Sequence, residues 1–313
     1  MSRHTAPHAH TLATIVTAAT ALVVATYSRR MRLQLPDGRK VDARIKGKRI
    51  KPVCGDRVEA EPIADEPDWL ITAICERRNE LTRPNLRGKV EVLAANIDRL
   101  LVMAAPSPEP DWSIVDRYLC AAELIHASAA VVFNKCDLHD GESFDAVLED
   151  YARIGYRTVR CSAKSGDNVE AVTALLHDGV AIIVGQSGVG KSSLINCLLR
   201  DERQRVAAVS DRSGEGRHTT VNSALLQLPG GGAVIDSPGV RDYAPALEAA
   251  EVVGGYREIA AAGRDCRFAN CRHLREPGCA VKRAVEEGTI SERRYDSYRH
   301  LLALTTKLTS GKY

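Results

Sequence analysis

The sequence predicts a multidomain α/β protein with a small N-terminal β-barrel, a central α/β domain and a helical C-terminal region around a cysteine cluster. Three observations predict this division. Short strand patterns joined by turns fill residues 21–85, apolar strands alternate with helical stretches over residues 90–245, and three of the nine cysteines gather at 266–279. We expect residues 1–20 to be a disordered leader and residues 246–313 to form the C-terminal region.

Composition narrows the class of protein. A chain of 313 residues is long enough for two or three domains of roughly 100–200 residues each. The net charge is only +3, so any nucleic-acid surface must come from local clusters of cations. Six of the nine cysteines are scattered, and an odd number cannot pair completely, which favours a reducing compartment such as the cytoplasm over a disulfide scaffold.

The longest apolar run, residues 12–27, contains four threonines and is shorter than the roughly 20 residues that a membrane helix needs. A secretory signal peptide is the alternative, but nothing downstream is typical of a secreted protein. Thr, Val and Ile favour strands. We therefore expect strand material here and no association with a membrane.

The barrel prediction rests on short strands separated by turns. Apolar and polar residues alternate on both sides of Pro-Asp-Gly at 36–38, a pattern typical of a β-hairpin. Several such strands in one short region indicate a small barrel of the OB-fold type. The region also carries cations that form either an ordinary solvated face or a surface for RNA phosphates. These RNA-contact candidates are Lys40, Arg44, Lys46, Lys48, Arg49 and Lys51.

The central region carries a phosphate-binding loop. Residues 185–192 match G-x-x-x-x-G-K-S between an apolar strand and an amphipathic helix. The glycines let backbone amides converge on phosphates, Lys191 would contact the β and γ phosphates as a catalytic group, and Ser192 would bind Mg²⁺. The predicted nucleotide-binding positions are Gly185, Gln186, Ser187, Gly188, Val189, Gly190, Lys191, Ser192 and Ser193.

Two downstream stretches complete the phosphate and magnesium side. Asp236 ends an apolar strand in Asp-Ser-Pro-Gly, where its carboxylate would hold Mg²⁺ through water and the Gly239 amide would meet the γ-phosphate. Arg-His-Thr-Thr at 217–220 lies in a polar stretch that is typical of a mobile loop. Either Thr219 or Thr220 would coordinate Mg²⁺ while the γ-phosphate is present.

Two upstream stretches are typical of guanine recognition. Asn-Lys-Cys-Asp at 134–137 and Cys-Ser-Ala-Lys at 161–164 each follow an apolar strand. The Asp137 carboxylate would accept hydrogen bonds from guanine N1 and N2, which adenine does not offer in that arrangement. The asparagine would contact the base and brace the loops, the two lysines would cover the base, and Ser-Ala would offer backbone contacts to guanine O6. The candidates are Asn134, Lys135, Asp137, Ser162, Ala163 and Lys164.

The order of these stretches is the reverse of that in an ordinary GTPase, because the base-reading pair precedes the phosphate-binding loop. Joining the old ends and cutting between Asp-x-x-Gly and Asn-Lys-x-Asp preserves every strand–loop unit. The sequence therefore predicts a circularly permuted P-loop GTPase domain. The segment after Gly239 then leads straight into the C-terminal region, and we expect nucleotide-dependent motion to reach that region directly.

Hydrolysis needs a group that orients the attacking water. Many GTPases use a glutamine directly after Asp-x-x-Gly, but this chain has Val240, which cannot hydrogen-bond to water. His218 is the candidate replacement, with Arg217 or an external partner as alternatives. A solvated histidine without a role is the other interpretation.

The cysteine cluster has the spacing Cys-x4-Cys-x-His-x5-Cys. Three thiolates and one imidazole suit a closed, four-coordinate structural Zn²⁺ site, whose metal would supply folding free energy to short loops. Unligated cysteines are the alternative. The zinc candidates are Cys266, Cys271, His273 and Cys279. The helical tail that follows carries basic and tyrosine residues, which suit either an RNA-facing surface or a solvated helix bundle.

The order of these motifs together with the cluster resembles the ribosome small subunit-dependent GTPase A family of bacteria. The resemblance covers nearly the whole chain after about residue 20, including a helix at 108–123 before the base-reading strand. It implies an OB-fold that contacts ribosomal RNA, a GTPase domain, a zinc domain, and a low intrinsic activity that the small subunit stimulates during its late maturation. The family's hydrophobic residue in place of glutamine matches Val240, and its proposed catalytic histidine matches His218. The polar, His-containing N-terminus departs from the family pattern.

Three hypotheses follow. In the leading one, the protein is a monomer that binds premature small ribosomal subunits and their rRNA in its GTP form, hydrolyses GTP once docked, and leaves in its GDP form. In the second, it is a GTP-gated RNA-binding module with negligible hydrolysis, as Val240 would allow. In the third, the cysteine cluster exchanges its metal and the protein acts in metal delivery.

Overall fold

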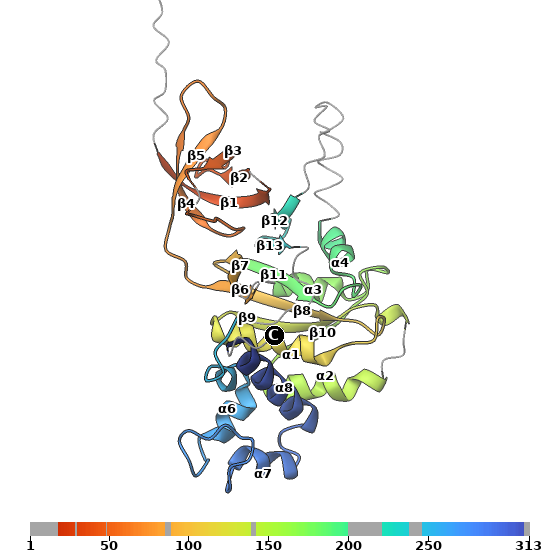
Figure 1. Ribbon diagram of the computed structural model, residues 1–313. Helices are drawn as coiled ribbons and strands as arrows, with labels where there is room; N and C mark the ends of the chain where they lie inside the picture. The colour runs from red at the N-terminus through yellow and green to blue at the C-terminus, as the bar shows by residue number, and fades with distance from the viewer. Residues whose placement is uncertain are drawn as a thin grey trace, which may run out of the picture.

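The computed structural model describes residues 18–28, 30–47, 49–84, 89–138, 142–199, 221–237 and 246–309. An N-terminal β-barrel and a group of C-terminal helices lie at opposite ends of the molecule, with an α/β domain between them (Figure 1). Residues 1–17 of the predicted leader lie outside the described residues, and the predicted end of the leader at residue 20 is wrong, because Ala19 and Thr20 already belong to the first strand.

The barrel has five strands and is closed. Their order is β1-β2-β3-β5-β4, and β4 pairs back with β1. β3 and β5 run parallel while the other neighbours run antiparallel, which is the OB-fold arrangement that the sequence predicted. Alternate side chains point inward, as in Val23, Leu33 and Val58, which are fully buried. The strands are β1 Ala19–Tyr27, β2 Met31–Gln34, β3 Lys40–Ile45, β4 Arg57–Pro62 and β5 Trp69–Ile74.

A hairpin that the sequence patterns did not predict follows the barrel. Its strands, β6 Glu80–Pro84 and β7 Val90–Ala95, form a separate two-stranded sheet across the expected boundary between barrel and α/β domain. Leu81 and Ala94 are fully buried in the core of the α/β domain. The hairpin therefore packs with that domain.

The α/β domain is a mainly parallel sheet, as predicted, and it has helices on both faces. Its strand order is β10-β9-β8-β11-β13-β12, and β12 at one edge is antiparallel. Alternate strand residues enter two separate cores, one under α1 and α2 and one under α3 and α4. The strands are β8 Arg99–Ala104, β9 Ser128–Phe133, β10 Arg157–Arg160, β11 Val180–Gly185, β12 Val221–Gln227 and β13 Ala233–Asp236. The helices are α1 Trp112–Leu124, the short 3₁₀ helix η1 Cys136–Leu138, α2 Glu142–Ile154, α3 Val169–Leu175 and α4 Lys191–Leu198.

The barrel and the α/β domain share one continuous sheet. β1 pairs antiparallel with β12, with Ala25 opposite Ala224 and Thr26 opposite Ser223. The barrel strand is thus bonded to the edge strand that follows the Arg-His-Thr-Thr stretch. Figure 1 shows β1 and β12 lying side by side.

The C-terminal helices pack against α1. They are η2 Val252–Gly255, α6 Arg257–Gly263, α7 Ala280–Glu286 and α8 Glu292–Thr309. Cys120 of α1 lies where a side chain at Gly255 would have to sit, because an added Cβ there would be 2.1 Å from its sulfur. Within the described ranges, no helix combines the length and the apolar character needed to cross a membrane.

A buried ionic network fixes this packing. Asp116 of α1 and Arg294 of α8 are both fully buried, and the Arg294 Nη1 donates to Asp116 Oδ1 at 2.7 Å. Arg294 also bonds the Glu258 carboxylate, at 2.7 and 3.1 Å. The Tyr151 hydroxyl donates to Asp116 Oδ1 at 2.6 Å, and Arg293 donates to its other oxygen at 2.9 Å. Burial alone would lower the pKa of Arg294, but Asp116 and Glu258 raise it well above its usual value.

This network changes the interpretation of the helical tail. The basic and tyrosine residues were expected either on an RNA-facing surface or in a solvated bundle. Instead, Arg294 is fully buried and Tyr298 is nearly so, and the rings of Tyr256 and Tyr298 meet edge to face with centroids 5.6 Å apart. Arg294 holds the C-terminal helices onto α1, and the two tyrosines pack in the core among those helices.

Candidate nucleotide site and metal centre

The predicted nucleotide motifs lie at one edge of the parallel sheet. The Asn-Lys-Cys-Asp stretch follows β9, Cys-Ser-Ala-Lys follows β10, the phosphate-binding loop follows β11, and Asp236 ends β13. Because these strands are parallel near neighbours, their carboxyl ends place the loops side by side. The permuted chain order therefore still assembles one site.

Asn134 joins three of the loops. It is almost fully buried, its Nδ2 donates to the Val189 carbonyl at 2.8 Å, and its Oδ1 accepts the Ala163 N–H at 2.9 Å. Gly190 is required beside it, because its φ is +98° and an added Cβ would lie 2.3 Å from Asn134 Nδ2. The asparagine thus braces the loops, as the sequence predicted.

Lys135 has a bracing role that the sequence did not reveal. Its ammonium donates to the Ser107 carbonyl and to the Gly188 carbonyl, each at 2.7 Å. Gln186 ties the same segment from the other side, since its Oε1 accepts the Asp111 N–H at 3.1 Å. Asp111 is the N-cap of α1, so the phosphate-binding loop is connected to the helix that contacts the C-terminal region.

Asp137 is held with its carboxylate only partly covered. The Ser162 hydroxyl donates to Asp137 Oδ1 at 2.7 Å, and the Lys164 ammonium lies 4.0 Å from Oδ2. The Asp137 side chain is 24% exposed to solvent, and the Lys164 side chain is 82% exposed. An oriented acceptor next to solvent suits the N1 and N2 donors of guanine. The Ala163 N–H is engaged by Asn134, so any contact from it to guanine O6 would share that hydrogen.

The phosphate-binding loop leads directly into α4. The helix begins at Lys191, and its N-cap Gly190 has left-handed backbone geometry. The Lys191 ammonium donates to the Gly185 and Gln186 carbonyls, at 2.7 and 2.8 Å. Ser187 and Gly188 in the loop, and Ser192 and Ser193 in the first helical turn, are exposed. A helix N-terminus beside exposed loop amides suits a phosphate group.

The magnesium side is described only in part. Asp236 is half-buried at the end of β13. This strand pairs with β11, so Asp236 lies at the same edge of the sheet as the phosphate-binding loop. The other predicted residues, namely His218, Thr219, Thr220 and Gly239, lie outside the described residues, as does Val240. Their predicted roles stay predictions.

The barrel cations differ in their surroundings. Lys40, Lys46, Arg49 and Lys51 are exposed, and Lys48 lies outside the described residues. Arg44 is only partly exposed, pairs with Glu66, and lies 3.5 Å from the Asp68 carboxylate. These acids reduce the local positive charge, so Arg44 is a weaker candidate for RNA than the exposed lysines.

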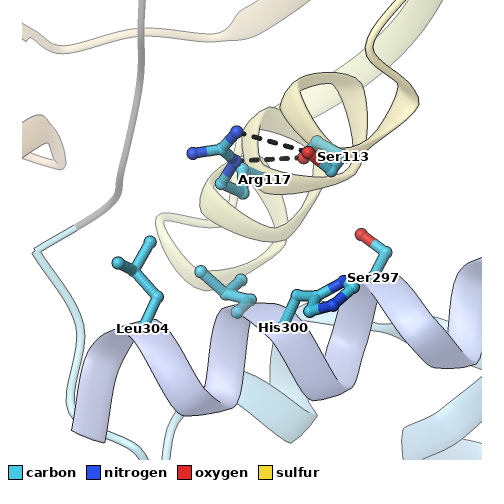
Figure 2. Close-up of a pocket in the computed structure, with 6 residues that line it drawn as sticks. Ser113, Arg117, Ser297, His300 and Leu304 are labelled. Atoms are coloured by element: carbon cyan, nitrogen blue, oxygen red, sulfur yellow. Dashed lines mark hydrogen bonds between the residues drawn. The ribbon is translucent and has the colours of Figure 1, made fainter. Parts of the chain in front are cut away.

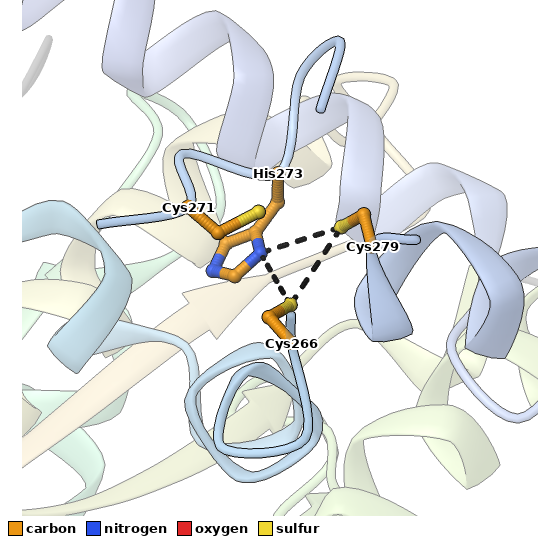
Figure 3. Close-up of side chains that lie close together, drawn as sticks. All are labelled: Cys266, Cys271, His273 and Cys279. Carbon is orange, nitrogen blue, oxygen red and sulfur yellow. Dashed lines mark hydrogen bonds between the residues drawn. The ribbon is translucent and has the colours of Figure 1, made fainter. Parts of the chain in front are cut away.

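The four predicted metal ligands come together (Figure 3). Their ligand atoms all lie within 4.8 Å of one another. Cys266 Sγ and Cys279 Sγ are 3.9 Å apart, and each lies 3.5 Å from His273 Nδ1. In a tetrahedral zinc site with Zn–S bonds of about 2.3 Å, two sulfurs stand roughly 3.8 Å apart. The donor set and its spacing therefore fit a four-coordinate zinc ion.

The cluster links α6 to α7. Cys266 follows α6, Cys279 is the N-cap of α7, and an added Cβ at Gly263 would lie 3.1 Å from the His273 ring. The Tyr295 hydroxyl of α8 donates to the His273 carbonyl at 2.5 Å. A metal here would thus join two helices that are each only seven residues long.

Glu276 holds the backbone of the loop between His273 and Cys279. The sequence did not predict this role. Its carboxylate accepts the N–H groups of Arg272, Leu274 and Arg275, each at 2.9 Å. The bond from the Arg272 amide is the main reason that its pKa is lowered to about 2. The only signal in the sequence is a lone acid just before the Pro-Gly turn.

A sequence model of the RsgA GTPase family matches residues 74–245. The chain belongs to the RsgA GTPase family. Among curated members, the small ribosomal subunit biogenesis GTPase RsgA of Azotobacter vinelandii is 44% identical over 255 residues, which is 80% of this chain and 74% of the relative. The protein of the same name from Haemophilus influenzae strain 86-028NP is 44% identical over 248 residues, covering 78% and 72% of the two chains.

Solved structures agree with the fold of this family. The crystal structure of YjeQ from Thermotoga maritima superposes with a TM-score of 0.72 at 29% identity and covers 92% of this chain and 99% of that one. The structure of YloQ, a circularly permuted GTPase, has a TM-score of 0.69 at 24% identity, with 96% and 98% covered, and supports the fold. Membership of the RsgA family makes the protein a GTP hydrolase, which favours catalysis over a binding module with negligible hydrolysis.

Proposed function

We propose that this GTPase binds the small ribosomal subunit and assists its late maturation. The observation that carries the proposal is the 44% identity, over 80% of the chain, to a protein named small ribosomal subunit biogenesis GTPase. The GTP form binds the premature subunit and its rRNA, GTP is hydrolysed to GDP and phosphate on docking, and the GDP form leaves. We infer that it acts as a monomer in the cytoplasm.

We infer that the nucleotide lies across the loops that Asn134 joins. The phosphates occupy the loop from Gly185 to Ser193, with Lys191 contacting the β and γ phosphates. Ser192 and Asp236 hold Mg²⁺ together with Thr219 or Thr220, and Gly239 meets the γ-phosphate. His218 orients the attacking water.

The guanine end of the site is tested by Asp137→Asn. The amide would keep the hydrogen bond from Ser162 through its oxygen, so the loop should fold normally. It would present a donor to guanine N1 or N2 in place of an acceptor. We expect GTP affinity to fall about a hundredfold or more and the preference for GTP over xanthosine triphosphate to shrink or reverse. Nucleotide competition in a fluorescence binding assay measures both.

The matched control is Asp178→Asn, because the Asp178 side chain is 90% exposed at the end of α3. It should bind all nucleotides as the unaltered protein does. An Asp137→Asn protein that kept its full preference for GTP would contradict the assignment of the base site.

We propose that the Cys266, Cys271, His273 and Cys279 cluster holds one structural Zn²⁺ and that it supports docking rather than the chemical step. Thiolates and an imidazole are donors that zinc prefers, and the bound ion would fix the loop between α6 and α7. The exposed cations of the barrel, Lys40, Lys46, Arg49 and Lys51, provide a second contact surface for rRNA phosphates.

Cys271→Ser tests the docking role of the cluster. We expect the variant to lose most of its bound zinc and to pellet with small ribosomal subunits at least about tenfold more weakly. Its intrinsic GTP hydrolysis should change far less, because the nucleotide loops are held by Asn134 and Lys135. Metal analysis, subunit pelleting and phosphate release measure the three quantities. Cys75→Ser, a half-buried cysteine outside the cluster, is the control. Equal loss of binding and hydrolysis would show that the cluster supports the GTPase domain instead.

A further inference from the structure

A groove lies along α8, next to residues 264–279, the segment between α6 and α7 that carries the candidate zinc ligands and is called the metal loop below. Its volume is about 560 Å³. Leu274 of the metal loop and Leu302 and Ala303 of α8 supply its apolar surface, and Arg272, Arg299 and Lys307 stand around it. We call it the α8 groove. Neither the nucleotide site nor the metal ligands use it.

Hydrogen bonds within the metal loop keep Leu274 at the surface of the groove. Leu274 is 37% exposed, and among the described residues few large hydrophobic side chains are so exposed. Its N–H is fixed by Glu276, and the neighbouring Arg272 carbonyl accepts the Tyr298 hydroxyl at 3.0 Å. Leu274 therefore faces solvent on a loop held by these hydrogen bonds, and with the exposed Ala303 it gives the groove an apolar lining that a partner side chain can contact.

The positive charge around the groove indicates which kind of segment can bind there. Three cations line it against one acid, Asp296, whose carboxylate is bonded to Arg299 at 3.1 Å. The terminal segments outside the described residues, 1–17 and 310–313, contain no Asp or Glu and so do not match this charge. A complementary occupant carries carboxylates beside apolar side chains.

RNA is a poorer match for this surface. Proteins that bind single-stranded RNA present aromatic rings on which bases stack. No Phe, Tyr or Trp side chain lines the α8 groove in the described part of the chain; its one ring is the imidazole of His300, and its apolar lining is aliphatic. We propose that the α8 groove binds an acidic segment of a partner protein, which inserts apolar side chains between Leu274 and Ala303.

A second hollow extends the surface toward α1. It has a volume of about 180 Å³ and is lined by Ser113 and Arg117 of α1 and by Ser297, His300, Leu301 and Leu304 of α8. Figure 2 shows the Arg117 guanidinium bonded to Ser113 across from His300 on α8. His300 lines both hollows, so a segment that crosses α8 there would reach Arg117. The partner would then contact the helix whose N-cap bonds Gln186 of the phosphate-binding loop.

The test uses a random dodecapeptide display library selected on the full-length, zinc-loaded protein. Library members that also bind an Ala303→Glu protein are removed. Ala303 is exposed, so the new carboxylate should keep the fold while it repels an acidic segment and fills the groove. We expect enrichment of peptides that combine Asp or Glu with Leu, Ile or Phe.

The best peptide is then measured by fluorescence anisotropy against matched pairs of variants. Ala303→Glu and Arg299→Glu should each weaken binding at least about tenfold. Ala261→Glu on α6 and Arg283→Glu on α7, which make the same changes at other exposed helical positions, should bind as the unaltered protein does. All four should keep their zinc and their intrinsic GTP hydrolysis.

Three results would overturn the proposal. The first is enrichment of no peptide whose binding depends on Ala303. The second is enrichment of peptides without acidic residues. The third is binding of a dodecamer RNA that is lost in the Ala303→Glu and Arg299→Glu proteins. That result would show that the groove is an RNA-binding surface.

Discussion

Replacing Lys191 by alanine is expected to reduce GTP turnover by a factor of about a hundred or more. Its ammonium is the only cation in the sequence of the phosphate-binding loop. We expect it to stabilise the negative charge that develops between the β and γ phosphates during hydrolysis. In the structure the ammonium already donates to two carbonyls of the loop, which hold it at the N-terminus of α4, beside the proposed phosphate site. Multiple-turnover phosphate release at saturating GTP measures the effect.

Lys282→Ala, on α7 far along the chain from the loop, makes the same change outside the site and should turn over GTP at the normal rate. Thermal unfolding of both variants checks that each protein is folded. A Lys191→Ala protein with near-normal turnover would mean that another cation performs the phosphate contact.

Arg294→Met should give the largest loss of stability. The substitution removes a fully buried cation. It leaves the buried Asp116 with Arg293 as its remaining ion-pair partner among the described residues, and it removes the Arg294 partner of Glu258. Breaking a buried ionic group by removing one member costs about 3–5 kcal/mol. For a protein of this size the melting temperature should fall by roughly 10 °C. Thermal unfolding at fixed zinc and nucleotide concentrations measures it.

Arg299→Met is the matched control on the same helix. Arg299 pairs with Asp296, but both side chains are about half exposed. An exposed pair of this kind contributes at most about 1 kcal/mol. Equal melting temperatures for the two variants would contradict the view that the buried network holds the C-terminal helices onto α1.

The motifs with local chemistry were predictable from the sequence. Pro-Asp-Gly gave the turn between β2 and β3, whose register pairs Gln34 with Lys40. The glycine-rich loop was placed correctly between β11 and α4, because the apolar strand, the glycines and the helix are contiguous. The four candidate metal ligands do lie together as predicted, because their residue types and spacing carry the information themselves.

Features that depend on distant parts of the chain were not predictable. β1 and β12 are separated by most of the sequence, and neither strand carries a local mark of its partner. Arg294 lies in a run of charged and tyrosine residues that reads as a solvated helix, and only tertiary packing shows that its guanidinium meets Asp116. In the same way, the spacing of Asn-Lys-Cys-Asp predicts base recognition but not the bonds from Lys135 to Ser107 and Gly188.

The shared sheet and the buried network also give the nucleotide site two structural connections. β12 bonds the barrel to the edge of the α/β domain, and α1 joins the phosphate-binding loop to the C-terminal helices. The barrel with its exposed cations and the C-terminal helices are thus both attached to elements that border the nucleotide site. This arrangement suits a GTPase whose hydrolysis depends on docking.

The most direct test of that account is steady-state GTP hydrolysis by the purified protein, alone, with purified small ribosomal subunits, and with large subunits as the control. We predict slow hydrolysis by the protein alone, strong stimulation by small subunits, and none by large subunits. Tight GTP binding with no stimulation by small subunits, or equal stimulation by both subunits, would contradict the proposed function.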